Sequence, residues 1–268
     1  VQPFISVVPW LPLASGDPVV VGIAASAGGP SALATVIGSV AADLPICLAV
    51  VQHLPRGFAP SFVSFLQARC SLTVCLAEHG QLPRSATVVV APDDHHLELV
   101  DGHFALTGGP PVEGHRPSGT VLLRSLAALG SSAIGVVLSG IGRDGADGLR
   151  AMRDRHATTI AQDAESSVVY GMPRAAVEEG AAQSVLPVGQ IGDAIVAAAA
   201  RARRRRRPGP PPSWPSSSSA SPASRSTAAV SASRSTASSP SGSRCSGSPA
   251  SRTTQRSPPT PGAWSSTG

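Results

Sequence analysis

Short runs of consecutive apolar residues recur along the chain and do not alternate with polar positions. The four clearest are "PVVVGIA" at 18–24, "PICLAVVQ" at 45–52, "ATVVVAP" at 86–92 and "AIGVVLS" at 133–139. Unbroken apolar runs of this length are typical of strands buried on both faces, as in a parallel sheet covered by helices. We therefore expect these runs to be strands of one mostly parallel sheet.

The segments between these runs have a different period. Residues 30–43, 59–70 and 118–130 have helical spacing and length. Residues 96–108 instead predict a β-hairpin, with Asp101 and Gly102 at its turn. The predicted fold class is α/β: a doubly wound, mostly parallel sheet with helices on both faces and an inserted β-hairpin.

Charge divides the chain into parts. Of its 268 residues, 1–200 hold 10 Arg and all 16 acidic residues, a net charge of −6, whereas 11 Arg and no acid follow from Arg201. The +5 of the whole chain therefore says nothing about the partner of the folded part. We predict a linker or fragment edge over 1–17, a globular domain over 18–197 and a disordered Arg/Ser/Pro-rich tail over 198–268.

The tail leaves two interpretations open. A run of arginines can bind nucleic acid or acidic lipid, and this is the only route by which we expect nucleic acid to bind. The simpler interpretation is a solvated tail, or an out-of-frame translation product of GC-rich DNA.

Neither metal binding nor membrane insertion is predicted. The four cysteines show no CxxC pair or zinc-ligand spacing, which fits a reducing, cytoplasmic setting, and Cys47 has the surroundings of a buried apolar residue. His95 and His96 follow Asp93 and Asp94, and a polar turn explains this cluster without a metal. No apolar stretch reaches the roughly 18 residues that span a bilayer.

The small residues "GIAASAGGP" at 22–30 follow the first predicted strand. A dinucleotide site would need G-x-G-x-x-G and an acid after the second strand, but the glycine spacing differs and Gln52 and His53 stand there. A Walker A loop needs lysine, and the chain has none. The alternative is a nucleophile, because "AASAG" is half of a G-x-S-x-G elbow around Ser26.

Two further polar residues follow predicted strands. His53 comes after 45–52 and Asp144 after 133–139, so parallel strands would bring both to the same sheet edge as Ser26. Ser–His–Asp constellations depend on geometry and not on chain order. Taken singly, Ser26 is also explained as a helix N-terminal residue, His53 as a surface histidine and Asp144 as a turn or cap residue.

Six blocks in this order resemble the catalytic domain of the chemotaxis protein-glutamate methylesterases, the CheB family. The resemblance extends from about residue 18 to 196 and rests on "GIAASAGGP", "VVQHLPRGFAPSF", "VVVAPDDHHLEL", "HRPSGTVLLRSLA", "GVVLSGIGRDGADGL" and "IAQDAESSVVYGMPRAAVEEGA". It implies hydrolysis of methyl esters on glutamate side chains of chemoreceptor signalling helices, with glutamine deamidation as a related activity, and no metal or organic cofactor.

The resemblance also implies residue roles. Ser26 would be the nucleophile, His53 the general base and Asp144 the residue that orients it, with the backbone N–H of Ile141 in the oxyanion hole. Arg116 and the segment 170–173, including Tyr170 and Met172, would help to position substrate.

Some features depart from the family pattern. Gly119, Thr120 and Leu123 replace the family's usual Val, Asp and Phe near the substrate cleft, so the protein target is less firmly implied than the reaction. Because 17 residues precede the first predicted strand, we expect this chain to lack the family's receiver domain. We expect either an ungated enzyme or a piece of a larger fusion with a methyltransferase.

The alternative from another class is a catalytically silent module that docks receptors or a kinase.

Overall fold

Seven strands form one parallel sheet at the centre of the fold. The structure is a computed structural model and describes residues 17–206. Along the chain the elements are β1 (Val19–Ala25), α1 (Gly29–Gly38), β2 (Ile46–Gln52), α2 (Ala59–Gln67), β3 (Thr73–Leu76), β4 (Thr87–Val90), β5 (His96–Val100), β6 (His103–Thr107), α3 (Gly119–Leu126), the 3₁₀ helix η1 (Ala127–Ser132), β7 (Ala133–Val137), α4 (Ala146–Asp154), β8 (Thr158–Gln162), α5 (Met172–Glu178), β9 (Ser184–Leu186) and α6 (Val188–Arg206).

The strand order in the sheet is β3-β4-β2-β1-β7-β8-β9, and every neighbouring pair is parallel. β5 and β6 form a separate antiparallel pair.

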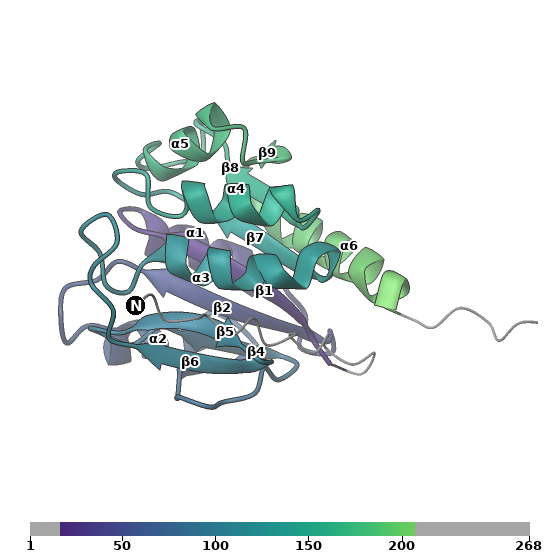
Figure 1. Ribbon diagram of the computed structural model, residues 1–268, viewed down its shortest axis with the longest axis horizontal. Helices are drawn as coiled ribbons and strands as arrows, with labels where there is room; N and C mark the ends of the chain where they lie inside the picture. Colours follow the sequence, from purple (N-terminus) through teal and green to yellow (C-terminus); the bar gives the residue numbers. More distant parts are fainter. Residues whose placement is uncertain (1–16, 207–268) are drawn as a thin grey trace, which may run out of the picture. The chain divides into compact units, whose positions relative to one another are not determined.

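Helices cover both faces of the sheet (Figure 1). One apolar cluster joins the strands to α1, α2 and α6, and a second joins them to α3, α4, α5 and the hairpin. The residues of β1 show the division, because Val21 and Ile23 belong to the first cluster and Val20 and Ala24 to the second. This arrangement confirms the predicted doubly wound fold with its inserted hairpin, whose turn residue Asp101 has a φ of 50°.

The last helix extends past the predicted end of the domain. The sequence predicts a domain boundary at residue 197, but α6 continues to Arg206. Its apolar positions Ile191, Ile195, Ala198, Ala199 and Ala202 are buried at helical spacing, and alanine and arginine both favour helix. The Arg206 guanidinium also donates to the Ser132 carbonyl oxygen at 3.0 Å.

Two predicted segments cannot be compared with the structure. The lead-in up to residue 16 and the chain from residue 207 onward lie outside the described residues. Within residues 17–206, no helix combines the length and the apolar character needed to cross a membrane.

The strand order fixes where a site can form. β1 lies in the middle, with β2 on one side and β7 on the other. In open α/β sheets ligands bind beyond the carboxyl ends of the strands, where the strand order reverses. The loops after β1, β2 and β7 meet at this edge.

Candidate active site

Ser26 lies in the turn between β1 and α1. Its N–H donates to the Ser139 carbonyl oxygen at 3.0 Å, and its own carbonyl oxygen accepts from the N–H of Gly29 at 2.8 Å. Gly28 has a φ of 80°, and a Cβ there would lie 2.5 Å from Cβ of Val168. A tightly held backbone thus carries a half-buried serine at the carboxyl edge of the sheet.

His53 occupies the equivalent position after β2. Ala25 and Gln52 are partners in the parallel register of β1 and β2, and the N–H of His53 donates to the Ala25 carbonyl oxygen at 3.0 Å. Ser26 and His53 therefore sit beside each other on strands that run about 4.8 Å apart.

The His53 ring is oriented by Asp144. Its Nε2 lies 2.8 Å from Oδ2 of Asp144, and because a carboxylate only accepts, this nitrogen carries the hydrogen. Nδ1 then bears the lone pair; it is buried and has no hydrogen-bond partner in the described part of the chain. Within residues 17–206 no hydrogen bond joins the Ser26 hydroxyl to this ring, and such bonds often form only when substrate binds.

Asp144 is enclosed by donors from the start of α3. Oδ1 accepts from the Ser118 hydroxyl at 2.7 Å and from the N–H of Thr120 at 2.9 Å, while Oδ2 accepts from the N–H of Gly119 at 2.6 Å and from His53. The carboxylate thus occupies a helix N-terminus, where unpaired N–H groups and the helix dipole favour negative charge. It is 1% exposed.

These contacts set the charge of Asp144. Burial by itself raises the pKa of the Asp144 carboxyl, but the hydrogen bonds from His53, Ser118, Thr120 and Gly119 outweigh it and hold this pKa well below its usual range. The carboxylate is therefore ionised at neutral pH, and it can both fix the His53 tautomer and stabilise an imidazolium.

A second histidine supports this helix start. The buried His96 accepts the N–H of Ser118 on Nδ1 at 3.2 Å, and its Nε2 lies 3.0 Å from the Pro110 carbonyl oxygen. His96 therefore holds the residue that caps α3. His95 and Asp93, its neighbours in the predicted polar turn, are hydrogen-bonded to backbone groups. Among the described residues no group of three or more His, Cys, Asp or Glu side chains is arranged to hold a metal ion.

Ile141 and Tyr170 flank the serine turn. Gly140 packs so closely that a Cβ there would lie 2.8 Å from Cβ of Ser26, which places Ile141 next to the serine. The Ile141 side chain is 65% exposed. Tyr170 forms a parallel bridge with Gly140.

The side chain of Met172 lies beneath the loop after β7. Met172 is 0% exposed, and its Sδ would lie 2.1 Å from a Cβ at Gly140. It belongs to the core and supports this loop, so the predicted help in positioning substrate would act through the loop and not through a side-chain contact. Arg116 lies nearer the edge, where its guanidinium donates to the Gly109 carbonyl oxygen at 2.9 Å.

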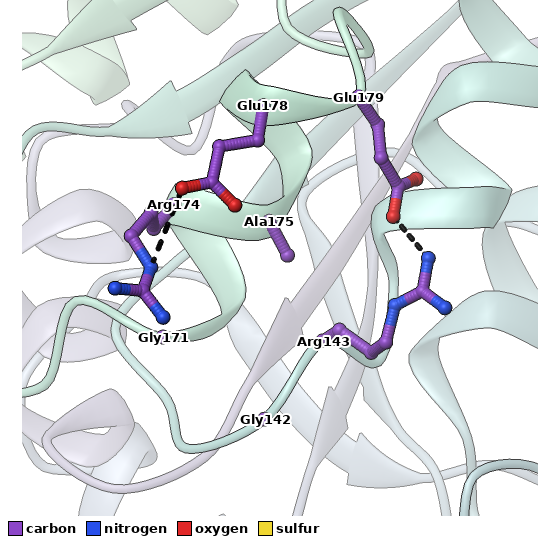
Figure 2. A pocket seen from close by; sticks show the side chains of 7 residues that line it. All are labelled: Gly142, Arg143, Gly171, Arg174, Ala175, Glu178 and Glu179. Atoms are coloured by element: carbon purple, nitrogen blue, oxygen red, sulfur yellow. Dashed lines mark hydrogen bonds and ion pairs between the residues drawn. The ribbon is translucent and has the colours of Figure 1, made fainter.

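An open pocket of about 440 Å³ lies beside this edge, between the loop after β7 and α5. Figure 2 shows Gly142 and Gly171 next to each other at one side of it, with one ion pair between Arg143 and Glu179 and another between Arg174 and Glu178. The charged residues of the lining are therefore paired, and their charges sum to zero. Ala175 and the two glycines form the rest of the lining.

Several site residues were not found from sequence. Ser118 before an apolar helical run is a recognisable N-cap signal, so its position at a helix start was accessible. Gln52 contacts the Ser26 and His53 carbonyl oxygens, His96 contacts the N–H of Ser118, and the His115 ring stacks on the His53 ring. These side-chain contacts reach across the fold, and no spacing in the sequence indicates them.

The fold and site define a class: doubly wound α/β proteins that gather a serine, a histidine and an aspartate at the carboxyl edge of the sheet. Within that class, the chain belongs to the CheB methylesterase family, whose family model matches residues 21–195.

Similar proteins support this membership. The chain is 45% identical over 169 residues to a protein-glutamate methylesterase/protein-glutamine glutaminase of Paramagnetospirillum magneticum. The aligned region covers 63% of this chain and 48% of that protein. It is 45% identical over 178 residues to the protein-glutamate methylesterase FrzG of Myxococcus xanthus, covering 66% and 53%. The chain spans about half the length of these curated relatives.

A solved structure gives the same result. The CheB methylesterase catalytic domain of Thermotoga maritima matches with a TM-score of 0.65 and 34% identity, over 68% of this chain and 98% of that one. The match covers nearly the whole of that domain, so the family resemblance and the predicted fold are both confirmed.

Proposed function

We propose that this chain is a serine hydrolase that removes methyl esters from glutamate side chains of chemoreceptor proteins. The observation that carries the proposal is the buried His53–Asp144 pair beside Ser26, with Nε2 committed to the carboxylate and Nδ1 left as the base. The names of the similar proteins support the same reaction and add deamidation of protein glutamine.

In the proposed mechanism Nδ1 of His53 takes the Ser26 hydroxyl proton as the oxygen attacks the ester carbonyl carbon. The tetrahedral intermediate collapses when the C–O bond to the methoxy group breaks, and the imidazolium returns its proton to release methanol. Water then attacks the acyl-serine with His53 again as base, giving glutamate and free Ser26. Asp144 stays ionised throughout and stabilises the imidazolium.

The negative oxygen of the intermediate needs a donor. The backbone N–H of Ile141 is our candidate, because Gly140 packs against Ser26 and donates its own N–H elsewhere, to the Val169 carbonyl oxygen. A main-chain donor of this kind contributes about 3 kcal/mol to transition-state stabilisation. Nucleophile, base and oxyanion donor all come from the protein's own groups.

The substrate region follows from the same geometry. The pocket between Gly142 and Ala175, whose lining charges sum to zero, adjoins Ile141 and suits residues that flank the modified glutamate on a receptor helix. Arg116 and Tyr170 remain candidates for positioning that helix. A methyltransferase, as partner or fusion, would supply the methyl ester. The free cysteines at 47, 70 and 75 fit the reducing cytoplasm where receptor signalling helices lie.

Methanol release from a methylated chemoreceptor fragment tests the proposal. Ser26→Ala should abolish release while the thermal melting temperature stays near that of wild type. Undiminished release would overturn the assignment of Ser26. A serine-directed fluorophosphonate distinguishes the alternative of a silent docking module, because only a competent serine reacts with it.

A further inference from the structure

The side chain of Gln52 connects the two loops that carry the proposed nucleophile and base. Its Nε2 donates to the Ser26 carbonyl oxygen at 2.8 Å and to the His53 carbonyl oxygen at 3.0 Å. Gln52 is the last residue of β2 and is 5% exposed. Neither carbonyl belongs to the sheet, so this amide is a separate tie between the two strand ends.

The orientation of the amide is fixed by its surroundings. Both neighbours are carbonyl oxygens, which only accept, so the NH₂ group must face them. Oε1 then points the other way; it is buried and has no partner among the described residues. A Cβ at Gly29 would lie 2.1 Å from Oε1, so the first residue of α1 must be glycine to accommodate it.

From these contacts we propose that Gln52 is a positioning residue for ester hydrolysis. One NH₂ group, with two hydrogens, holds the backbone of Ser26 and the backbone of His53 to a common point. It thereby sets the separation between the Ser26 hydroxyl and Nδ1 of His53 without touching substrate. This proposal rests on the proposed function.

Gln52→Met and Gln52→Glu test the tie, because each has nearly the length of glutamine but cannot make both bonds at neutral pH. Gln67→Met is a matched control. Its amide also bridges two backbone groups, the Leu72 carbonyl oxygen and the N–H of Val74, both at 2.9 Å. That bridge lies at β3, on the far edge of the sheet.

Three measurements are made on each variant: the melting temperature, the rate of Ser26 labelling by a fluorophosphonate, and kcat and KM for methanol release. A displacement of about 1 Å between reacting groups costs about 10²-fold, so we expect labelling and kcat to fall by this factor in both Gln52 variants. KM should stay within about twofold, since Gln52 makes no substrate contact. Gln67→Met should retain wild-type kcat, even where its melting temperature falls.

Gln52→Glu supplies a readout that a purely structural role would not give. Its protonated carboxyl can again donate one hydrogen bond, whereas the carboxylate faces two carbonyl oxygens. The ratio of variant to wild-type labelling rate should therefore rise as the pH is lowered from about 8 to about 5 in the folded protein.

The outcomes separate the two proposals. If wild type is labelled but releases no methanol, the proposed substrate is wrong. The comparison of labelling rates still tests the role of Gln52. Labelling of Gln52→Met at the wild-type rate overturns the role of Gln52 alone. The role of Gln52 is also overturned if Gln67→Met loses as much labelling rate and kcat as Gln52→Met at an equal loss of melting temperature. If Gln52→Met does not fold, the test is the ratio of the Gln52→Glu labelling rate to the wild-type rate. A ratio that does not change with pH contradicts the proposed role of Gln52.

Discussion

The imidazole of His115 lies face to face with the imidazole of His53. Their ring centroids are 3.7 Å apart and their planes differ by 11°. His115 is presented by a tight turn in which Val112 and His115 exchange two backbone hydrogen bonds of 3.0 Å, with Glu113 and Gly114 at φ values of 51° and 81°. The ring of the proposed base is therefore fixed at its edge by Asp144 and over its face by His115.

The protonation state of His115 bears on catalysis. Burial lowers the pKa of His115, the neighbouring His53 lowers it further, and Asp144 opposes both. His115 is therefore neutral at pH 7 and gains a proton only below the ordinary histidine value of about 6.5. Once protonated, it places a cation against the ring that becomes an imidazolium in the proposed mechanism.

We predict that His115→Phe changes the pH profile while keeping the stack. In wild type, protonation of His115 at acid pH places a cation against the ring of the proposed base, so kcat/KM should fall more steeply with decreasing pH in wild type than in His115→Phe. His115→Ala, which removes the ring, should lower kcat by about 2- to 10-fold at neutral pH. Steady-state methanol release across pH measures both effects, and an equally steep acid fall in wild type and His115→Phe would refute the coupling.

Asp144→Asn should affect both activity and acid stability. The amide cannot accept from His53 and the α3 donors as a carboxylate does, so kcat should fall by about 10³- to 10⁴-fold. Because folding lowers the pKa of Asp144, its stabilising contribution is fully present above the ordinary Asp value of about 3.9 and is lost as pH falls toward the folded pKa. Urea unfolding from about pH 6 downward should therefore show a steeper acid loss of unfolding free energy in wild type than in the variant.

Asp147→Asn is the control for this experiment. Asp147 lies on α4 and pairs with Arg124 and Arg143 at the surface, where its side chain is 37% exposed. Surface pairs contribute about 0–1 kcal/mol, so its removal should leave kcat and the acid dependence close to wild type. A kcat loss equal to that of Asp144→Asn would show that charge in this region, and not the contact with His53, is responsible.

The sequence patterns that predicted the structure correctly are those that arise within a single strand or helix. The apolar runs of β1, β2, β4 and β7 report burial on both faces, and strand ends in a parallel sheet determine which residues share an edge. Edge strands such as β3 and β9 are short and partly exposed, so their runs carry little signal. The end of α6 was predicted too early, because the arginine run has the composition of a tail. The alanines of the same segment nevertheless pack in the core.

The supporting residues of the site escaped prediction for a different reason. In the sequence, Gln52 indicates only that a ribose-binding acid is missing after the second strand, and no pattern singles out His115. Each acts through a side-chain contact with a residue from another loop, and such contacts depend on rotamers and on the path of loops. Local patterns place backbone elements; they do not place these side chains.

Gly119 explains one departure from the family pattern in physical terms. A Cβ at Gly119 would lie 2.4 Å from Cβ of Ala24 and 3.4 Å from Oδ2 of Asp144. We expect Gly119→Ala to lower the unfolding free energy by about 1–3 kcal/mol, because α3 must move away from β1. It should also lower kcat, since the N–H of residue 119 would move from Asp144.

Gly189→Ala provides the comparison for the glycine prediction. Gly189 lies in the first turn of α6, and a Cβ there meets nothing within 4 Å. Alanine should therefore stabilise the protein by about 0.4–1 kcal/mol through the unfolded state. Chemical denaturation of the two variants measures the contrast, and similar values for both would mean that α3 adapts to the added methyl group.

The proposed oxyanion donor can be removed without changing the nucleophile or the base. Proline at position 141 lacks an N–H, so Ile141→Pro should lower kcat by about 10²- to 10³-fold, with a smaller change in KM. Ile141→Ala keeps the main-chain donor and removes only an exposed side chain, so its kcat should stay close to wild type. The melting temperatures of the two variants show whether proline disturbs the loop. Equal losses of kcat in both would place the role in the side chain, and wild-type activity in Ile141→Pro would require another donor for the oxyanion.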